Sequence, residues 1–215
     1  MKLVLHNYWR SSASYRTRIG LALKQLAYAY VPVNLRDGEQ HGDAHKAKNP
    51  LEFVPVLEIV EDDGTVRTLT QSLAILEYLD ERWPEAPLLP RDAYLRARTR
   101  ALAEIINSGI QPHQNLATLK RLKALGVNEQ AYAQGYIERG LVAYERLAAD
   151  VAGHFSVGDL PTLADCALIP QLYAARRFSL DIARFPLLAA IEERCLALPA
   201  FVAAAPDRQV DAVTS

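Results

Sequence analysis

The sequence has few cysteines, no dominant charge and no long apolar run. Its 215 residues include only two cysteines, too few for the disulfide framework of a small secreted protein. Lysine and arginine number 24 against 25 acidic residues, so no basic surface is available to neutralise nucleic-acid phosphates. No window approaches the about 18 apolar residues of a membrane span, and the first ten residues lack the features of a signal peptide. These absences predict a soluble, cytoplasmic, globular protein that binds neither nucleic acid nor membrane.

Motifs for common cofactors and metals are also missing. Neither G-x-G-x-x-G nor G-x-x-x-x-G-K-[ST] occurs, which excludes the usual phosphate-binding loops. None of the five histidines lies in an H-E-x-x-H motif. His41 and His45 are spaced by four residues, but their segment is polar and loop-like, which favours solvated side chains over metal ligands. We therefore expect no metal site, and half of the chain is apolar, which suffices for a hydrophobic core without one.

Residues 1–83 alternate short apolar runs with helical stretches. Pro32 places the second apolar run at a sheet edge, and the Asp-Gly step within residues 61–65 predicts a hairpin between the last two. A helix with Ile19, Ala22, Leu23 and Leu26 on its apolar face follows the first run, and Ser72 is expected to cap another. The order predicts a mixed, four-stranded α/β sheet (βαβ-ββα) rather than a doubly wound nucleotide fold. The strands are expected at residues 2–7, 29–35, 56–60 and 66–69.

The rest of the chain has only helical periodicity. Residues 84–92 contain three prolines and are predicted to form a linker. An all-α helical bundle is expected over residues 93–215, ending in a loose tail from Pro206. The helical stretches are expected at residues 93–125, 128–151, 162–178 and 186–198.

The most informative segment is W-R-S-S-A-S-Y-R-T-R, residues 9–18. Three serines, Ser11, Ser12 and Ser14, occupy the step from the first strand into the first helix. A single serine, Ser12 or Ser14, would suffice to cap that helix. Hydroxyls and unpaired amides at a helix N-terminus also favour negative charge, and a bound thiol would ionise more readily there. The residues alone leave both interpretations open.

Two further pairs lie in the same half of the chain. Pro55 follows Val54 at the start of a strand, where a cis bond would leave backbone groups available to a ligand. Gln71 and Ser72 open a second helix and provide a second N-terminal site for an anion. Each pair also has a purely structural explanation: Pro55 as part of a turn, and Gln71 with Ser72 as a helix cap.

Together these motifs resemble the zeta class of the glutathione transferase family over essentially the whole chain. W-R-S-S-A-S-Y-R is similar to the class signature R-S-S-C-S-x-R, except that Ala13 replaces the cysteine. The resemblance implies a thioredoxin-like N-terminal domain, an all-helical C-terminal domain and a homodimer. The other similar segments are N-P with V-P at 49–55, Q-S-L-A-I at 71–75, I-Q-P with Q-N-L at 110–116, and A-R-R-F at 175–178.

The resemblance also implies glutathione as the cofactor and gives roles to individual residues. Ser11 would hydrogen-bond the glutathione sulfur, with Ser12 beside it. The other implied contacts are Gln40 with the glycyl end, Val54 before cis-Pro55 with the cysteinyl part, Gln71 and Ser72 with the γ-glutamyl end, and Gln111 and Asn115 from the helical domain.

The chemistry implied is glutathione-dependent isomerisation of a small unsaturated diacid. A thiolate adds to the cis double bond of maleylacetoacetate, the bond rotates, and elimination gives fumarylacetoacetate, a step of tyrosine and phenylalanine breakdown. Arginines suit the substrate carboxylates. Arg10 directly precedes the serines, whereas Arg176 and Arg177 alone resemble a surface pair at a helix end; the resemblance favours Arg177 as a clamp.

Other functions remain open. Isomerisation of maleylpyruvate would need the same thiolate and arginines. A transferase or dehalogenase acting on α-halo acids would consume glutathione, and a non-catalytic binding or stress protein would use the fold alone. Because glutathione supplies its own sulfur, isomerisation is expected to survive Ala13.

Overall fold

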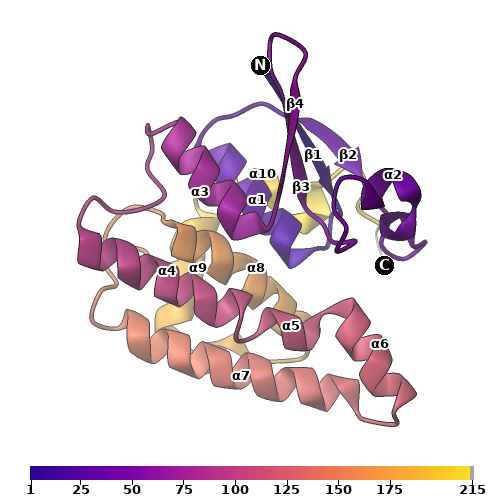
Figure 1. The fold of residues 1–215 in the computed structure, drawn as a ribbon. Helices are drawn as coiled ribbons and strands as arrows, with labels where there is room; N and C mark the ends of the chain where they lie inside the picture. The colour runs from indigo at the N-terminus through magenta and orange to yellow at the C-terminus, as the bar shows by residue number, and fades with distance from the viewer. Residues whose placement is uncertain (214–215) are drawn as a thin grey trace. The chain divides into compact units, whose positions relative to one another are not determined.

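The first part of the chain forms a four-stranded mixed sheet (Figure 1). The structure is a computed structural model that describes residues 1–213. The strand order is β2-β1-β3-β4; β1 and β2 are parallel, and the other neighbours are antiparallel. The predicted sheet is therefore confirmed, with Pro32 at the end of an edge strand. The strands are β1 (Lys2–Asn7), β2 (Ala29–Pro32), β3 (Val56–Val60) and β4 (Val66–Thr70).

Two helices, α1 (Ser12–Leu23) and α3 (Ser72–Arg82), pack on one face of this sheet. The alternation along β1 turns Leu3 and Leu5 towards the helices, as expected for a half-buried strand. The short helices η1 (Glu39–His41) and α2 (Asp43–Lys46) lie in the connection from β2 to β3. The shared apolar core consists of Leu3, Leu5, Leu21, Leu57, Ile59, Ile75 and Leu79.

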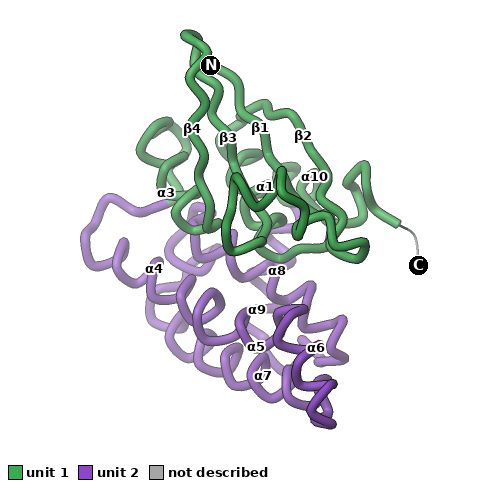
Figure 2. Tube along the Cα trace, turned by 45° about the vertical axis from the view of Figure 1, so that its right-hand side comes forward, with its two compact units in different colours: residues 1–88, 198–215 green, residues 89–197 purple. Residues whose placement is uncertain are grey.

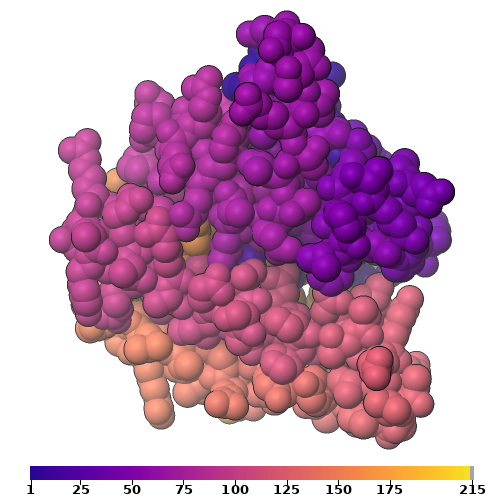
Figure 3. All heavy atoms as spheres, in the orientation of Figure 1, coloured from indigo at the N-terminus to yellow at the C-terminus, as the bar shows by residue number. Residues whose placement is uncertain are grey.

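The Asp-Gly hairpin forms as predicted between β3 and β4. Gly64 has a φ of +85°, a left-handed conformation that glycine adopts without steric cost. The Glu61 N–H donates to the Thr65 carbonyl across 2.9 Å and closes the turn. In the space-filling view the hairpin tip stands out at the top (Figure 3).

The C-terminal segment belongs to the same compact unit as the sheet. That unit comprises residues 1–88 and the chain from Leu198 onward (Figure 2). Helix α10 (Pro199–Ala204), followed by η3 (Pro206–Arg208), packs on α1. The helical periodicity instead predicts that everything from residue 93 lies in the helical domain, because six helical residues carry no sign of their packing partner.

This packing changes how α1 is buried. The predicted apolar stripe has Ile19 fully buried, but Ala22, Leu23 and Leu26 only partly so. Every residue from Ser14 to Leu21 is buried instead, because α10 covers a side of α1 that the stripe left to solvent. The arginines of α1 are therefore inside the unit.

The second compact unit, residues 89–197, contains helices and no β-strand among its described residues. The continuous helix expected over residues 93–125 is wrong. A new helix begins at Gln111 with Pro112 in its first turn, and Asn115 caps a third. The elements are α4 (Ala93–Asn107), α5 (Gln111–Gln114), α6 (Leu116–Ala124), α7 (Glu129–Ala148), α8 (Leu163–Arg177), η2 (Ile182–Arg184) and α9 (Pro186–Leu196).

Residues 83–92, which connect α3 to α4, form neither helix nor strand. Within residues 1–213, no helix has the length and apolar character needed to cross a membrane.

Candidate functional site

The N-terminus of α1 carries the serine cluster. Ser11 is the N-cap: its backbone is extended, with φ −69° and ψ 124°, and its Oγ accepts the Ser14 N–H at 3.2 Å. The cap is therefore Ser11 rather than Ser12 or Ser14. Ser12 and Ala13 are the first helical residues, whose amides have no carbonyl partner within the helix. Because Ser11 Oγ accepts the capping bond, its own proton can be donated to a ligand.

The other two serines of the cluster differ in burial. Ser12 is half-buried, whereas Ser14 is fully buried and its Oγ accepts the Tyr8 N–H at 3.3 Å. Arg10 is also half-buried, and its guanidinium carbon lies 5.4 Å from the centroid of the Trp9 ring. Ser11, Ser12 and Arg10 thus surround one helix start, where the helix dipole favours an anion.

The start of α3 is linked to the same helix. The buried Arg16 of α1 donates from Nη1 to Ser72 Oγ at 2.8 Å. Ser72 was expected to cap α3; it is instead the first helical residue, and the N-cap position is Gln71. Gln71 has a φ of +68°, which is uncommon for a side chain other than glycine and is typical of strained functional positions.

Val54 and Pro55 are joined by a cis peptide bond, as predicted. The β1–β3 ladder begins at the pair His6 and Val56, so Val54 lies beyond the paired strand. Its side chain packs with Tyr8 and Trp9 in one apolar cluster, beside the segment that leads to Ser11.

Gln40 lies on η1 and is buried. One end of its amide contacts His41 Nε2 at 3.0 Å, while its Oε1 has no hydrogen-bond partner among residues 1–213. A buried amide oxygen without a partner costs about 1–3 kcal/mol, so a ligand that donates to it would be favoured.

The remaining candidates lie in the second unit. Gln111 begins α5 and is half-buried, and Asn115 caps α6 by accepting the Ala117 N–H at 2.9 Å. Both arginines at the end of α8 are exposed. Arg176 forms two hydrogen bonds of 2.5 Å with the Glu192 carboxylate, which raise the pKa of the guanidinium above its usual range.

Arg16 is not among the site residues that the sequence predicts. Its spacing of four residues from Ser12 places both on one side of α1, and this was the available signal. Arginine at a buried helix position is rare, so its charge argued for an exposed face instead.

Comparisons with known proteins agree with this geometry. Residues 10–82 match the model of the glutathione S-transferase N-terminal domain. A crystal structure of maleylacetoacetate isomerase from Anaeromyxobacter dehalogenans, with glutathione bound in its active site, is 54% identical with a TM-score of 0.92, covering 99% of this chain and 98% of that one. Another structure of that protein contains dicarboxyethyl glutathione and citrate.

Two curated relatives are also similar over nearly their full lengths. Glutathione S-transferase Z1 of Arabidopsis thaliana is 44% identical over 100% of this chain and 96% of its own. Maleylpyruvate isomerase of Ralstonia sp is 44% identical over 96% of this chain and 98% of its own. At this identity and coverage, together with the thioredoxin-like sheet and the serine-capped α1, the chain belongs to the zeta class of the glutathione transferase family.

Proposed function

We propose that this chain is a glutathione-dependent cis–trans isomerase that converts maleylacetoacetate to fumarylacetoacetate in tyrosine and phenylalanine breakdown. The observation that carries the proposal is the start of α1, where the Ser11 hydroxyl and two unpaired amides converge. The A. dehalogenans isomerase, with glutathione in its active site, supports both the cofactor and the substrate.

The polar groups of the first unit fit glutathione. Ser11 and Ser12 suit its sulfur. The backbone of Val54 before Pro55, which lies outside the strand ladder, suits its cysteinyl peptide group. The unpartnered Gln40 Oε1 is a buried acceptor for an N–H near the glycyl end. Gln71 and Ser72, at the N-terminus of α3, suit the γ-glutamyl end.

Within this proposal, glutathione supplies when bound the thiolate that adds to the cis double bond and leaves again after rotation. Ser11 donates a hydrogen bond to the sulfur, and the N-terminus of α1 favours its negative charge, so the thiol ionises at lower pH. Both effects stabilise the thiolate before the substrate binds and again when elimination releases it from the substrate.

The substrate carboxylates need cationic partners, and arginine pairs with a carboxylate through two hydrogen bonds. We assign Arg10, adjacent to Ser11, and Arg177 to this role. Arg176 is the weaker candidate because Glu192 already holds its guanidinium. In the second unit, Gln111 and Asn115 are proposed to contact the cofactor.

Ala13 leaves the site without a protein thiol. Cys166 and Cys195 are both fully buried in the second unit, and burial raises the pKa of the Cys195 thiol far above its usual range. We therefore expect the nucleophilic sulfur to come from glutathione alone.

The decisive experiment follows isomerisation of maleylacetoacetate by the purified protein with and without glutathione. Turnover that requires glutathione but does not consume it would support the proposal. Glutathione consumption with halide release from α-halo acids would favour a transferase or dehalogenase. No glutathione binding would favour a non-catalytic protein.

Maleylpyruvate is the second candidate substrate, favoured by the similarity to the Ralstonia enzyme. The shorter diacid needs the same thiolate and arginines, so the two assays should run in parallel. The ratio of their kcat/KM values decides between them.

We further propose a cytoplasmic homodimer, as the resemblance to the class implies. Light scattering during size-exclusion chromatography tests the assembly, and a mass of one chain would exclude it. Fractionation of cells that express the protein tests the location.

A further inference from the structure

The segment that follows α10 is held against the loop that leads into α1, instead of forming the predicted loose tail. Gln209 Nε2 donates to the carbonyls of Ala203 at 2.9 Å and Ala205 at 2.8 Å, which ties the segment back onto α10. Ala212 packs against the cluster of Tyr8, Trp9, Val33 and Val54. Residues 214–215 of the expected tail lie outside the described residues.

Asp211 makes two contacts to the sheet unit through its two oxygens. Its Oδ2 accepts the backbone N–H of Trp9 at 3.1 Å, and its Oδ1 accepts the Tyr30 hydroxyl. Burial and the hydrogen bond to Asp211 raise the pKa of Tyr30, so the phenol stays protonated and remains the donor. One carboxylate from the end of the chain therefore joins β2 to the loop between β1 and α1.

The other side of the Trp9 peptide unit is held by Arg18. This fully buried guanidinium donates from Nη2 to the Trp9 carbonyl at 2.8 Å. It also donates to Asn7 Oδ1 at 2.9 Å and to the Ala204 carbonyl at 3.0 Å. The N–H and the C=O of Trp9, two residues before Ser11, are thus both fixed by charged side chains.

Arg18 and Asp211 carry complementary charges. Burial lowers the pKa of Arg18, while the nearby Tyr30, Tyr28 and Asp211 raise it. Asp211 is the only carboxylate among these influences, and a buried cation needs a nearby anion to offset lost hydration. Removing Asp211 would therefore loosen the loop both directly and through Arg18.

We propose that Asp211 is a positioning residue for the glutathione thiolate: by fixing the Trp9 peptide, it sets the place of the Ser11 hydroxyl at the start of α1. This inference rests on the proposed role of Ser11. The C-terminal segment thereby becomes part of the support of the active site, although it is separated from Ser11 by nearly the whole chain.

The test compares four purified full-length proteins: wild type, Asp211→Ala, Asp211→Asn and Val210→Ala. Val210 is 84% exposed and neighbours Asp211, so its substitution controls for changes to the segment itself. Asparagine can still accept from Trp9 N–H and donate to the Tyr30 oxygen, so it preserves the hydrogen bonds but removes the charge.

The melting temperature of each variant is measured first, and three further quantities are then measured below it. They are kcat/KM for isomerisation, the pKa of the bound glutathione thiol from its thiolate absorbance, and the emission of Trp9. For the last, all four proteins carry Trp83→Phe, which leaves Trp9 as the single tryptophan.

We expect Asp211→Ala to lower kcat/KM by about tenfold to a hundredfold, since a misplaced catalytic group costs on this scale. The thiol pKa should rise and Trp9 emission should change, with partial rescue in Asp211→Asn and no change in Val210→Ala. A lower melting temperature with unchanged kcat/KM and unchanged thiol pKa would overturn the proposal.

The thiol pKa separates this inference from the proposed function. If wild type binds glutathione with a lowered thiol pKa but isomerises neither diacid, the isomerase proposal fails and the thiol pKa of Asp211→Ala still decides the role of Asp211. If wild type does not lower the thiol pKa, both proposals are overturned.

Discussion

At the scale of single residues, the Ser11 hydroxyl has two roles: its oxygen caps α1, and its proton is available to a ligand. Its oxygen accepts the Ser14 N–H and so begins α1. The three serines located this site in the sequence, but any of them can cap a helix. The choice depends on where the backbone leaves the extended conformation. Arg18 and the distant Asp211 hold the Trp9 peptide, two residues before that point.

Two substitutions of Ser11 separate these roles. Ser11→Ala removes both the capping acceptor and the proton donor. We expect kcat/KM to fall by about 10²–10³ and the free energy of unfolding by about 1 kcal/mol. Ser11→Asp keeps a capping acceptor but has no proton to donate at neutral pH, so stability should return while activity does not. Chemical denaturation and isomerase kinetics check both variants; an active Ser11→Asp would contradict the proton-donor role.

The neighbouring arginines of α8 form a second matched pair. Arg177→Ala is expected to raise KM for the diacid while leaving glutathione affinity nearly unchanged. Arg176→Ala removes both hydrogen bonds to the buried Glu192 and should cost about 1–3 kcal/mol of stability with little change in KM. Kinetics and thermal unfolding of both variants distinguish these outcomes, and a reversed pattern would assign the clamp to Arg176.

At the scale of elements, local signals predicted strands better than helices. β1 and β3 match their expected bounds because alternation and the Asp-Gly turn are encoded within a few residues. The break between α4 and α6 was missed because the apolar periodicity continues through it. Ser72 differs from its expected place by one residue, as the first helical residue rather than the cap, because the cap is Gln71, whose positive φ has no signature in sequence.

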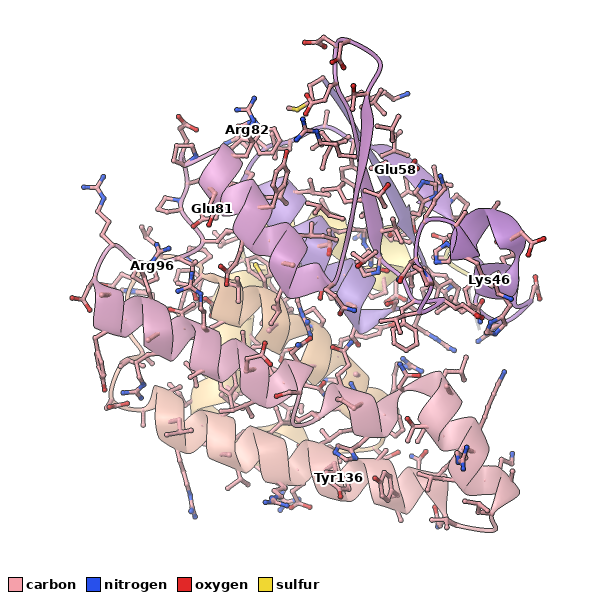
Figure 4. All side chains as sticks on the ribbon, viewed as in Figure 1. Lys46, Glu58, Glu81, Arg82, Arg96 and Tyr136 are labelled. Atoms are coloured by element: carbon pink, nitrogen blue, oxygen red, sulfur yellow. The ribbon has the colours of Figure 1, made fainter. Side chains whose placement is uncertain are left out.

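The face of the sheet opposite α1 and α3 provides a pH-dependent link between elements. Glu58 of β3 (Figure 4) accepts hydrogen bonds from His6 of β1 at 2.7 Å and from Lys48 at 2.5 Å. Partial burial raises the pKa of Glu58, but the bonds from Lys48 and His6 outweigh this and lower it overall.

Because the folded pKa of Glu58 is lower than the unfolded one, its stabilisation is present above about pH 4.3 and disappears as pH falls through the folded value. Glu58→Gln should therefore lower the melting temperature near neutral pH, and the difference from wild type should shrink on acidification. Melting curves from about pH 6 to about pH 3 test this. Glu81→Gln, an exposed change on α3, should show no such trend; a constant difference for Glu58→Gln would contradict the link.

At the scale of the whole molecule, the order of the chain and its packing do not coincide. The switch from mixed to purely helical periodicity correctly divided sheet from helices. It could not reveal that the chain returns at Leu198 to the first unit, because that contact joins residues about 186 positions apart, as in the bond from Arg18 to Ala204. The periodicity of a short stretch of sequence carries no information about a packing partner so far along the chain.

The return of the chain makes α1 dependent on α10. The Phe201 carbonyl accepts the Tyr15 hydroxyl of α1 at 3.4 Å. The Phe201 side chain is fully buried, so Phe201→Ala should cost about 3–5 kcal/mol. Hydrogen exchange should then speed up in α1, while the α7 amides of the second unit keep their protection. Val202→Ala, at a side chain that is 39% exposed on the same helix, should leave both unchanged. If Phe201→Ala accelerates exchange in α7 as much as in α1, the two units unfold together and α10 supports the whole chain rather than the sheet unit.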